Sequence, residues 1–370
     1  MNSQPPDSEV TPPVDAGAGA AAGSRINLFG MDRERLRSEF ESIGQKPWRA
    51  DQIMQWIYRR GVDDFDGMSN LSKDFRTRLR NDFVVQPPEL LGEQVSADGT
   101  RKWILKVGGG QAIETVFIPE KDRGTLCISS QVGCAMDCAF CSTGQQGLNR
   151  NLSTAEIVAQ VWFAAKTLGG NFQTERVISN VVFMGMGEPL ANYNAVLPAI
   201  HILQDDHGFG LSKRRVTVST SGLVPFIDRL RADADTAMAV SLHAPNDELR
   251  NELVPINRKY PLAELMEACR RYTSGRDHKM HLVYEYVMLD GVNDSPALAR
   301  DLARLLQDMP AKVNLIPFNP YPETRFKRSK REAIEKFSGI LRSRNILSTT
   351  RKTRGDDIDA ACGQLVGKVL

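Results

Sequence analysis

Between residues 153 and 349, two hydrophobic patterns alternate along the chain. Short apolar runs predict buried strands at 177–184, 215–220, 237–242, 280–288, 312–317 and 347–349. Segments with apolar residues three and four positions apart predict helices at 153–168, 194–204, 224–232, 262–272, 297–306 and 333–343. Repeated strand–helix units imply parallel strands with helical crossovers. We therefore expect an α/β fold, a partial (β/α)6 TIM-like barrel.

The chain before residue 153 is organised differently. Residues 1–25 are rich in Pro, Ala and Gly, which predicts a disordered tail. Apolar residues at helical spacing predict a small helical accessory domain at 26–90. Two strand-like segments, 102–107 and 112–118, flank a run of glycines and predict a β-hairpin. We expect the barrel domain to span 91–352, hairpin included, and a C-terminal segment to follow at 353–370.

Composition narrows the class of protein. The 370 residues are 41% hydrophobic, enough for a sizeable core. No apolar run approaches the ~20 residues that span a bilayer. The N-terminus also lacks the basic start and apolar block of a secretory signal, so we expect no membrane association and a cytoplasmic location. Thiols stay reduced there, and the six cysteines therefore indicate metal binding or catalysis before structural disulfides.

The net charge of +2 does not by itself indicate nucleic-acid binding, but the charge is unevenly distributed. Residues 324–355 contain 11 Lys and Arg against two Glu, and Lys213, Arg214 and Arg215 form a second cluster. A solvated face and a phosphate-binding surface both explain such clusters. Charge alone leaves these two interpretations open.

Cys134, Cys138 and Cys141 form a C-x3-C-x2-C motif on one short loop. Three thiolates suit an iron–sulfur cluster, and they leave one iron of a cubane open to bind substrate. Zinc completed by a distant Cys or His is the alternative, although structural zinc normally uses C-x2-C pairs. The spacing, with Phe140 directly before the last cysteine, resembles the radical SAM superfamily. That resemblance implies a [4Fe–4S] cluster and S-adenosylmethionine (SAM) as cofactors.

Residues at the predicted strand ends indicate where SAM binds, because barrel enzymes carry their chemistry at these ends. In the radical SAM superfamily, a glycine-rich strand end followed by Glu binds the methionine part of SAM. Gly187 and Glu188 match this motif. We expect the rest of the SAM site at later strand ends, which include Ser219, Ser241, Leu242, His243 and Asn319. Taken singly, each of these fits a turn cap or a satisfied loop residue equally well.

Three further cysteines lie outside the cluster motif, and one of them, Cys269, falls on a predicted helix and is assigned to structure. Cys127, in an apolar run, is by itself more often a core thiol, whereas Cys362 lies in a polar segment that contains glycine. From about residue 26 to about residue 366 the chain resembles the radical SAM RNA (adenine-C2)-methyltransferase family. The motifs that carry this resemblance are 113–119, 127–134, the cluster loop, 185–189, 219–222, 241–244, 316–320 and 354–364.

The resemblance implies a role for each thiol. Cys362 takes a methyl group from one SAM and becomes S-methylcysteine. A second SAM is cleaved to a radical that abstracts hydrogen from this methyl group, and the resulting carbon adds to adenine C2. Cys127 then removes the C2 proton, and a transient disulfide with Cys362 forms as the product leaves. Glu114 matches the family's proton acceptor; a surface strand carboxylate is the other interpretation.

The same resemblance implies the partners. The substrates are 23S rRNA, at the peptidyl-transferase centre, and tRNA, at the adenosine next to the anticodon. The expected electron donor is a flavodoxin or ferredoxin, and the expected state is a monomer. Because base chemistry usually requires an unstacked nucleotide, we expect RNA to contact the 26–90 domain by shape and the basic 324–355 segment by charge.

Three alternative functions remain open at this point. The first is adenine-C8 methylation of rRNA by the related resistance family, which shares the cluster and both outlying cysteines. The second is a non-enzymatic iron–sulfur or zinc RNA-binding protein, against which the missing fourth cysteine argues. The third is a radical SAM enzyme for a small molecule, which the basic segment and the paired thiols disfavour.

Overall fold

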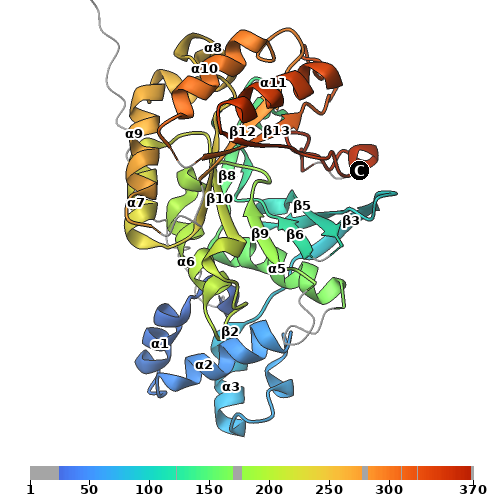
Figure 1. Cartoon of the computed structure of the whole chain (residues 1–370). Coiled ribbons are helices and arrows are strands. Elements are labelled where there is room, and N and C mark those ends of the chain that lie inside the picture. The colour runs from blue at the N-terminus through green and yellow to red at the C-terminus, as the bar shows by residue number, and fades with distance from the viewer. Residues whose placement is uncertain are drawn as a thin grey trace, which may run out of the picture.

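The computed structural model describes residues 25–121, 123–169, 177–276, 282–309, 311–322 and 324–367. The predicted tail at 1–25 lies outside this part of the chain except for Arg25. Figure 1 shows a small N-terminal module of helices, in blue, below a larger body in which helices cover a twisted sheet.

The N-terminal module consists of α1 (Arg33–Ser42), α2 (Trp48–Met54) continued by the turn η2 (Gln55–Arg59), and α3 (Lys73–Asp82). Strand β1 (Ile26–Asn27) pairs in parallel with β2 (Phe83–Val84). Asp32 and Ser72 cap α1 and α3, because each side chain accepts a hydrogen bond from a first-turn N–H. The Phe40 ring packs edge-on against Phe75 and Phe83, which closes a small apolar core.

An aromatic contact fixes this module on the larger body. The Trp162 indole donates a hydrogen bond to the Ile57 carbonyl at 2.9 Å, and its ring centre lies 5.5 Å from that of Phe29. Trp162 and Phe29 are both buried, so the contact joins the two parts through their shared core.

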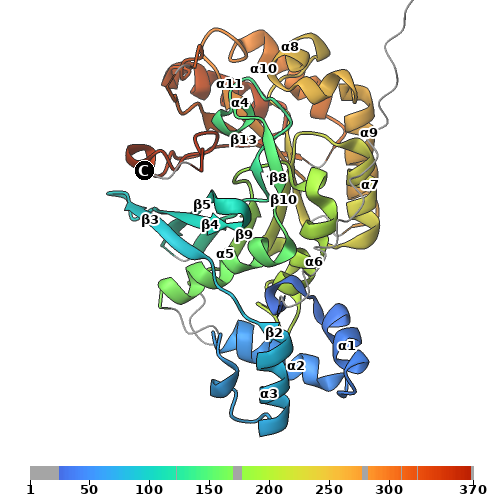
Figure 2. The same cartoon turned by 180° about the vertical axis from the view of Figure 1, so that it is seen from behind.

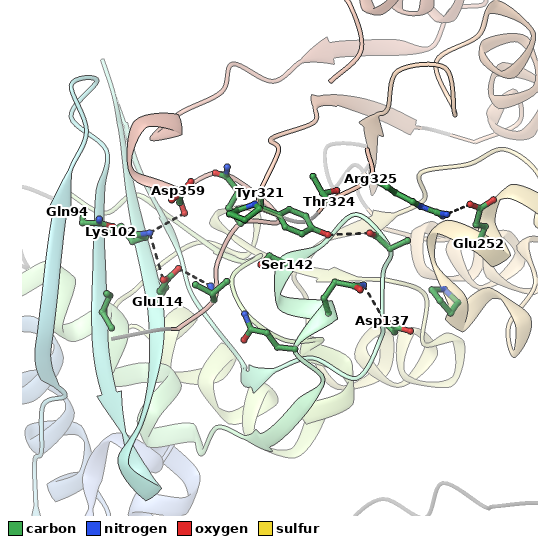
Figure 3. A pocket seen from close by; sticks show the side chains of 18 of the residues that line it. Gln94, Lys102, Glu114, Asp137, Ser142, Glu252, Tyr321, Thr324, Arg325 and Asp359 are labelled. Atoms are coloured by element: carbon green, nitrogen blue, oxygen red, sulfur yellow. Dashed lines mark hydrogen bonds and ion pairs between the residues drawn. The ribbon is translucent and has the colours of Figure 1, made fainter. Parts of the chain in front are cut away.

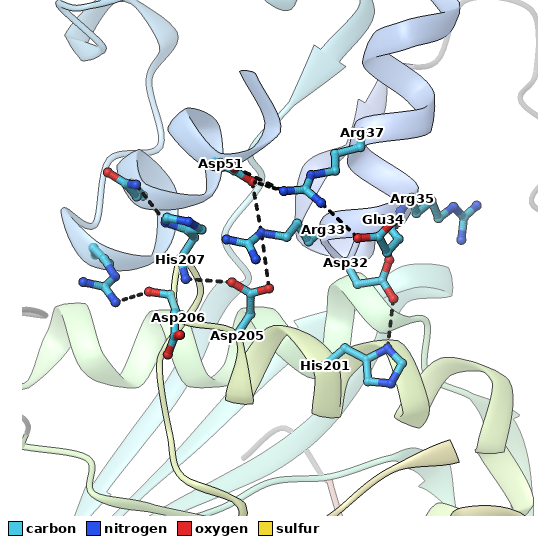
Figure 4. A network of polar contacts seen from close by, with 12 residues as sticks. Asp32, Arg33, Glu34, Arg35, Arg37, Asp51, His201, Asp205, Asp206 and His207 are labelled. Carbon is cyan, nitrogen blue, oxygen red and sulfur yellow. Dashed lines mark hydrogen bonds and ion pairs between the residues drawn. The ribbon is translucent and has the colours of Figure 1, made fainter. Parts of the chain in front are cut away.

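A polar network also joins the module to the larger body (Figure 4). The His201 Nδ1 atom lies 3.1 Å from Asp32 Oδ2, which ties the start of α1 to the barrel. The Arg33 Nε atom lies 3.0 Å from Asp51 and 3.6 Å from Asp205, so one guanidinium bridges two carboxylates from the two parts. The module is therefore held by packing and by charge.

Within the described residues, ten strands join into one sheet with the order β14-β13-β12-β11-β10-β9-β6-β5-β4-β3. The antiparallel edge contains β3 (Glu89–Val95), β4 (Arg101–Val107), β5 (Gln111–Glu120) and β6 (Arg123–Cys127). The parallel part continues from β6 through β9 (Asn180–Phe183), β10 (Val216–Thr220), β11 (Ala237–Ser241), β12 (Leu282–Met288), β13 (Ala311–Pro317) and β14 (Leu347–Thr350).

Helical crossovers connect the parallel strands: α5 (Thr154–Thr167), α6 (Tyr193–Gln204), α7 (Val224–Asp233), α9 (Leu262–Thr273), α10 (Pro296–Leu306) and α11 (Arg331–Ser343). Ser153 and Glu156 form a reciprocal capping box that starts α5. Each parallel strand from β6 to β13 is thus followed by a helix, which confirms the partial (β/α)6 barrel.

Several elements differ from the sequence expectation. The predicted hairpin is present as β4 and β5, but β3 and β6 extend it into a four-stranded edge. Strand β6 contains Gly124, where an added Cβ would lie 2.0 Å from the Val177 carbonyl oxygen, so the glycine serves close packing. Asn246 caps the short polar helix α8 (Asp247–Leu253), which hydrophobic periodicity does not reveal.

Around the cysteine loop, β7 (Gln131–Gly133) pairs with β8 (Leu148–Asn151), and α4 (Ser142–Gln145) lies between them in the chain (Figure 2).

In the part of the chain that the structure describes, no helix is long and apolar enough to cross a membrane.

Candidate active site

A cavity of about 160 Å³ opens at the carboxyl ends of the parallel strands. Ten of the predicted site residues line it: Cys134, Cys138, Cys141, Gly187, Glu188, Ser219, Ser241, His243, Asn319 and Cys362. They come from the cysteine loop, from strands β10 and β11 or the loops after β9, β11 and β13, and from the C-terminal segment. The fold therefore brings residues that are far apart in the sequence together around one cavity.

Short backbone hydrogen bonds shape the cysteine loop. The Cys134 N–H donates to the Gly147 carbonyl at 2.9 Å, and the Cys141 N–H donates to the Cys138 carbonyl at 3.0 Å. Burial raises the pKa of all three thiols, to about 12 for Cys134. Binding of a cationic iron core offsets this penalty, because the metal stabilises the thiolate form.

The arrangement of the three thiols fits a cubane. In the described part of the chain, no three His, Cys, Asp or Glu side chains converge as the ligands of one metal ion would. A cubane takes one thiolate per iron, so its ligands surround a volume and do not meet at a point. Cys134, Cys138 and Cys141 all line one cavity, and their three thiols are the donor type that such a cluster takes.

The loop after β9 holds Glu188 in a fixed position. Gly187 has φ 98°, and an added Cβ would lie 2.5 Å from the Gln131 side chain, so only glycine fits there. The Gln131 Oε1 atom accepts a hydrogen bond from the Glu188 N–H at 2.8 Å. The Glu188 carboxylate accepts from the Ser221 N–H at 2.8 Å and from its hydroxyl at 2.9 Å. Burial raises the pKa of Glu188, and these hydrogen bonds oppose the rise.

His243 is locked as a neutral ring at the end of β11. It has φ 60°, and its Nδ1 accepts a hydrogen bond from the Val287 N–H at 3.0 Å. The remaining proton is thus on Nε2. Burial, helped by the positive charge of Arg250, lowers the pKa of His243 to about 3. The ring packs edge-on against Phe140 at 4.5 Å, which links this strand end to the cysteine loop.

Leu242 and Asn319 have different surroundings. The Leu242 side chain belongs to the hydrophobic core and is not among the residues that line the cavity. If Leu242 contacts SAM, its backbone makes the contact, and the role of Leu242 in SAM binding stays a prediction. The Asn319 Oδ1 atom accepts a hydrogen bond from Arg328 at 2.8 Å, which orients the side-chain amide. Arg328, part of the basic 324–355 segment, therefore supports the cavity.

The C-terminal segment places Cys362 beside the cysteine loop. The Gly363 carbonyl accepts a hydrogen bond from the Ser142 N–H at 2.7 Å, and the Thr143 hydroxyl donates to the Leu365 carbonyl at 2.6 Å. The Cys362 Sγ atom accepts a hydrogen bond from Arg351 Nη1 at 3.3 Å. A negative charge on Cys362 would raise the pKa of Arg351, so the guanidinium stays charged beside this sulfur.

Cys127 ends β6 and is buried, with 7% of its surface exposed. Burial, reinforced by charge on Cys362, raises the pKa of its thiol to about 12, whereas Arg351 lowers it. The positive charge of the Arg351 guanidinium therefore acts on both Cys127 and Cys362. Cys127 itself does not line the cavity.

Glu114 lies in a second, larger cavity of about 910 Å³ (Figure 3). It is buried on β5, with one oxygen 3.8 Å from Lys102 Nζ and the other 3.4 Å from the Val366 N–H. Burial raises the pKa of Glu114, and the Lys102 ammonium opposes the rise. Lys102 also donates a hydrogen bond to the Asp359 carbonyl at 3.3 Å. This pair thus holds the segment that carries Cys362, and the proton-acceptor role of Glu114 stays a prediction.

Comparison with known proteins agrees with this geometry. Residues 26–85 match the family described as ribosomal RNA large subunit methyltransferase N-terminal domain, and residues 128–302 match the radical SAM superfamily. Over 344 residues the chain is 57% identical to the dual-specificity RNA methyltransferase RlmN of Alkalilimnicola ehrlichii, which covers 93% of this chain and 94% of that protein. The chain belongs to the RlmN family.

A solved structure supports the same assignment. The chain superposes on a radical SAM methyltransferase from Sphaerobacter thermophilus with a TM-score of 0.85 and 46% identity, over 93% of this chain and 100% of that one. As an RlmN family member the chain is a radical SAM methyltransferase, and its cofactors are a [4Fe–4S] cluster and SAM. The non-enzymatic RNA-binding alternative is thereby excluded.

Sequence reasoning missed the residues that support this site. Arg351 was counted only within a basic cluster, although its guanidinium contacts Cys362. Gln131 holds the Glu188 loop, and Arg250 binds several strand ends. Nothing in the local sequence distinguishes these side chains, because their partners lie between 8 and 57 residues away.

We expect Glu188→Gln to weaken SAM binding by about 1.5–3 kcal/mol, on the order of 10- to 100-fold, through loss of a charge-assisted hydrogen bond to the SAM amino group. Equilibrium dialysis with labelled SAM on cluster-loaded protein measures this. Glu264→Gln, on an exposed position of α9, is the matched control and should bind SAM normally. Unchanged affinity in Glu188→Gln would remove Glu188 from the SAM site.

Proposed function

We propose that this enzyme methylates C2 of adenine in 23S rRNA, at the peptidyl-transferase centre, and in tRNA, next to the anticodon. The reaction would use two SAM molecules and an S-methylcysteine at Cys362. The observation that carries this proposal is the position of Cys362, in the same cavity as three cluster thiols and Glu188. The printed name of the 57%-identical relative, a dual-specificity RNA methyltransferase, supports the substrate class.

The chemistry requires a radical route. Adenine C2 lies between two ring nitrogens, is electron-poor and does not attack the electrophilic methyl group of SAM. The [4Fe–4S] cluster, held by Cys134, Cys138 and Cys141, supplies with SAM a 5′-deoxyadenosyl radical. Glu188, Ser219, Ser241, His243 and Asn319 would orient SAM in the cavity that they line.

Arg351 and Cys362 prepare the methyl carrier. The Cys362 thiolate attacks the SAM methyl carbon, the methyl–sulfonium bond breaks, and S-adenosylhomocysteine leaves. The guanidinium of Arg351, 3.3 Å from Sγ, stabilises the thiolate that this step consumes. After hydrogen abstraction, the Cys362-bound carbon joins adenine C2.

Cys127 completes the reaction. Its thiolate would accept the C2 proton, and a [4Fe–4S] cluster held by Cys134, Cys138 and Cys141 would supply the acceptor for the electron that the adduct loses. Cys127 then loses this proton and its sulfur bonds to Cys362 sulfur, which breaks the bond from Cys362 to the transferred carbon. That carbon keeps the electron pair and takes one proton from solvent, which leaves a methyl group on adenine. Both thiols lie in the field of Arg351, which supports this exchange.

We expect Arg351→Met to slow methylation of Cys362 by on the order of 10- to 100-fold, because a charge-assisted hydrogen bond to the nucleophile is lost. Mass spectrometry of the Cys362 peptide after timed incubation with SAM measures the rate. Arg351→Lys should restore part of it, and the exposed neighbour variant Lys352→Met should not change it. Normal methylation in Arg351→Met would assign Arg351 to structure alone.

The larger cavity of Figure 3 is the entrance we propose for the unstacked adenine. The exposed basic residues of the 324–355 segment and the N-terminal module flank the RNA in this proposal. Within that segment, Arg325 pairs with Glu252 and Arg331 with Glu335, so Lys327 and Lys330 are better candidates for phosphate contacts. The enzyme would act as a cytoplasmic monomer, with a flavodoxin or ferredoxin as electron donor.

Mass analysis of modified RNA tests the proposal. Protein reconstituted under anaerobic conditions, with SAM and a chemical reductant, should form 2-methyladenosine in both 23S rRNA and tRNA. Formation of 8-methyladenosine would instead support the adenine-C8 alternative. Methylation of neither RNA, by protein that cleaves SAM, would support a small-molecule substrate.

A further inference from the structure

Arg250 is the most completely buried charged side chain near the site, with an exposed fraction of 0%. It lies on α8 and donates hydrogen bonds to three carbonyl oxygens: Ser221 at 2.6 Å, Ser241 at 3.1 Å and Leu242 at 3.1 Å. These carbonyls belong to the ends of β10 and β11, where the SAM-facing hydroxyls and His243 lie. One guanidinium therefore ties two strand ends together.

The charge of Arg250 is not neutralised by a contacting carboxylate. Its fourth hydrogen bond goes to the Asn257 side-chain oxygen at 2.7 Å, and in the described ranges it forms no ion pair. Asn257 in turn donates to Asp247, which is exposed. A buried cation with only neutral partners is costly, so a negative group nearby would stabilise it. Burial lowers the pKa of Arg250 to about 10, which leaves it charged at neutral pH.

The cysteine loop packs on the same helix. The Ala139 N–H, directly after Cys138, donates to the carbonyl of Leu253 on α8 at 3.1 Å. Cys138 and Phe140 pack with Leu253 in one apolar cluster. Arg250 therefore lies on the helix that packs against the loop with the proposed cluster ligands.

We propose that Arg250 is a positioning residue with two effects. The hydrogen bonds from its forked guanidinium group fix the ends of β10 and β11 for SAM binding, and its positive charge raises the reduction potential of the cluster. This rests on the cluster assignment to Cys134, Cys138 and Cys141. A cubane with three thiolates is anionic and becomes more so on reduction, so a buried cation favours the reduced form. Ease of reduction and SAM geometry would then depend on one side chain.

Two variants separate the effects. Arg250→Lys keeps a charge but loses the fork, and Arg250→Gln loses both. On anaerobically loaded protein, an EPR-monitored redox titration measures the midpoint potential, and equilibrium dialysis measures SAM affinity. We expect SAM affinity to fall at least about tenfold in both variants. The potential should become more negative in Arg250→Gln and stay near the wild-type value in Arg250→Lys. The exposed variant Arg270→Gln is the control.

Each result bears on the proposal. Loss of the cluster in Arg250→Gln with retention in Arg250→Lys would support the electrostatic part, because the variant that keeps a positive charge also keeps the anionic cluster. Equal potentials in the two variants, or failure of both to load iron, would overturn the electrostatic part. Wild-type SAM affinity in Arg250→Lys would overturn the claim that the Arg250 hydrogen bonds position the strand ends for SAM. Iron content, circular dichroism and the wild-type titration are read without RNA, so they are independent of the proposed methylation.

Discussion

Cys127→Ala should accumulate a covalent protein–RNA adduct, whereas Cys362→Ala should form neither adduct nor methylated RNA. The difference follows from the order of the two tasks. In the proposed reaction, Cys362 receives the methyl group before RNA reacts, so its loss would stop the reaction at the start. Cys127 would act after carbon has joined adenine, so its loss would leave the adduct unresolved. Denaturing gels with labelled RNA should show a nuclease-sensitive, retarded band in the Cys127 variant alone.

The remaining cysteine outside the cluster provides the control. Cys269 is buried on α9 and lies in the hydrophobic core, so Cys269→Ala should turn over normally unless it unfolds. Intact mass should also show S-methylcysteine in wild type and in Cys127→Ala. If Cys127→Ala turned over like wild type, Cys127 would be a core thiol and the two-thiol scheme would fail.

Replacement of any one of Cys134, Cys138 and Cys141 by Ala should abolish SAM cleavage. Each thiol is expected to hold one iron, so the loss of any one leaves the cluster without one of its three proposed ligands. Anaerobically reconstituted variants should lose the brown absorbance of the cluster and form no 5′-deoxyadenosine. Iron and sulfide analysis, with circular dichroism as a check on folding, measures this directly. A full cluster in any single variant would contradict the assignment.

The sequence predicted the barrel well because its strand–helix units are regular and strongly patterned. It did not predict β6, whose Gly124 is required by packing against Val177, or α8, whose role lies in polar contacts. The local hydrophobic pattern indicates how a segment buries its own apolar residues. It does not indicate which contacts that segment makes with distant parts of the chain.

The same limit explains the candidate site. The cysteine motif and Gly187-Glu188 are local signals and were readable from the sequence, and the cavity contains them. Arg351 and Arg328 looked like parts of a charged surface, because their partners Cys362 and Asn319 become neighbours only in the fold. Leu242 is a strand-end residue whose side chain turns to the core, a distinction that one residue of register decides.

The central claim is that methyl carbon passes from SAM to adenine C2 through Cys362. The most direct measurement is the mass of 2-methyladenosine formed in naked 23S rRNA by anaerobically reconstituted wild-type protein with SAM that carries a trideuterated methyl group. Hydrogen abstraction from the Cys362 methyl group and a final protonation from solvent predict a product methyl with two deuterium atoms and one hydrogen. A product that retained all three deuterium atoms, or no 2-methyladenosine at all, would contradict the account.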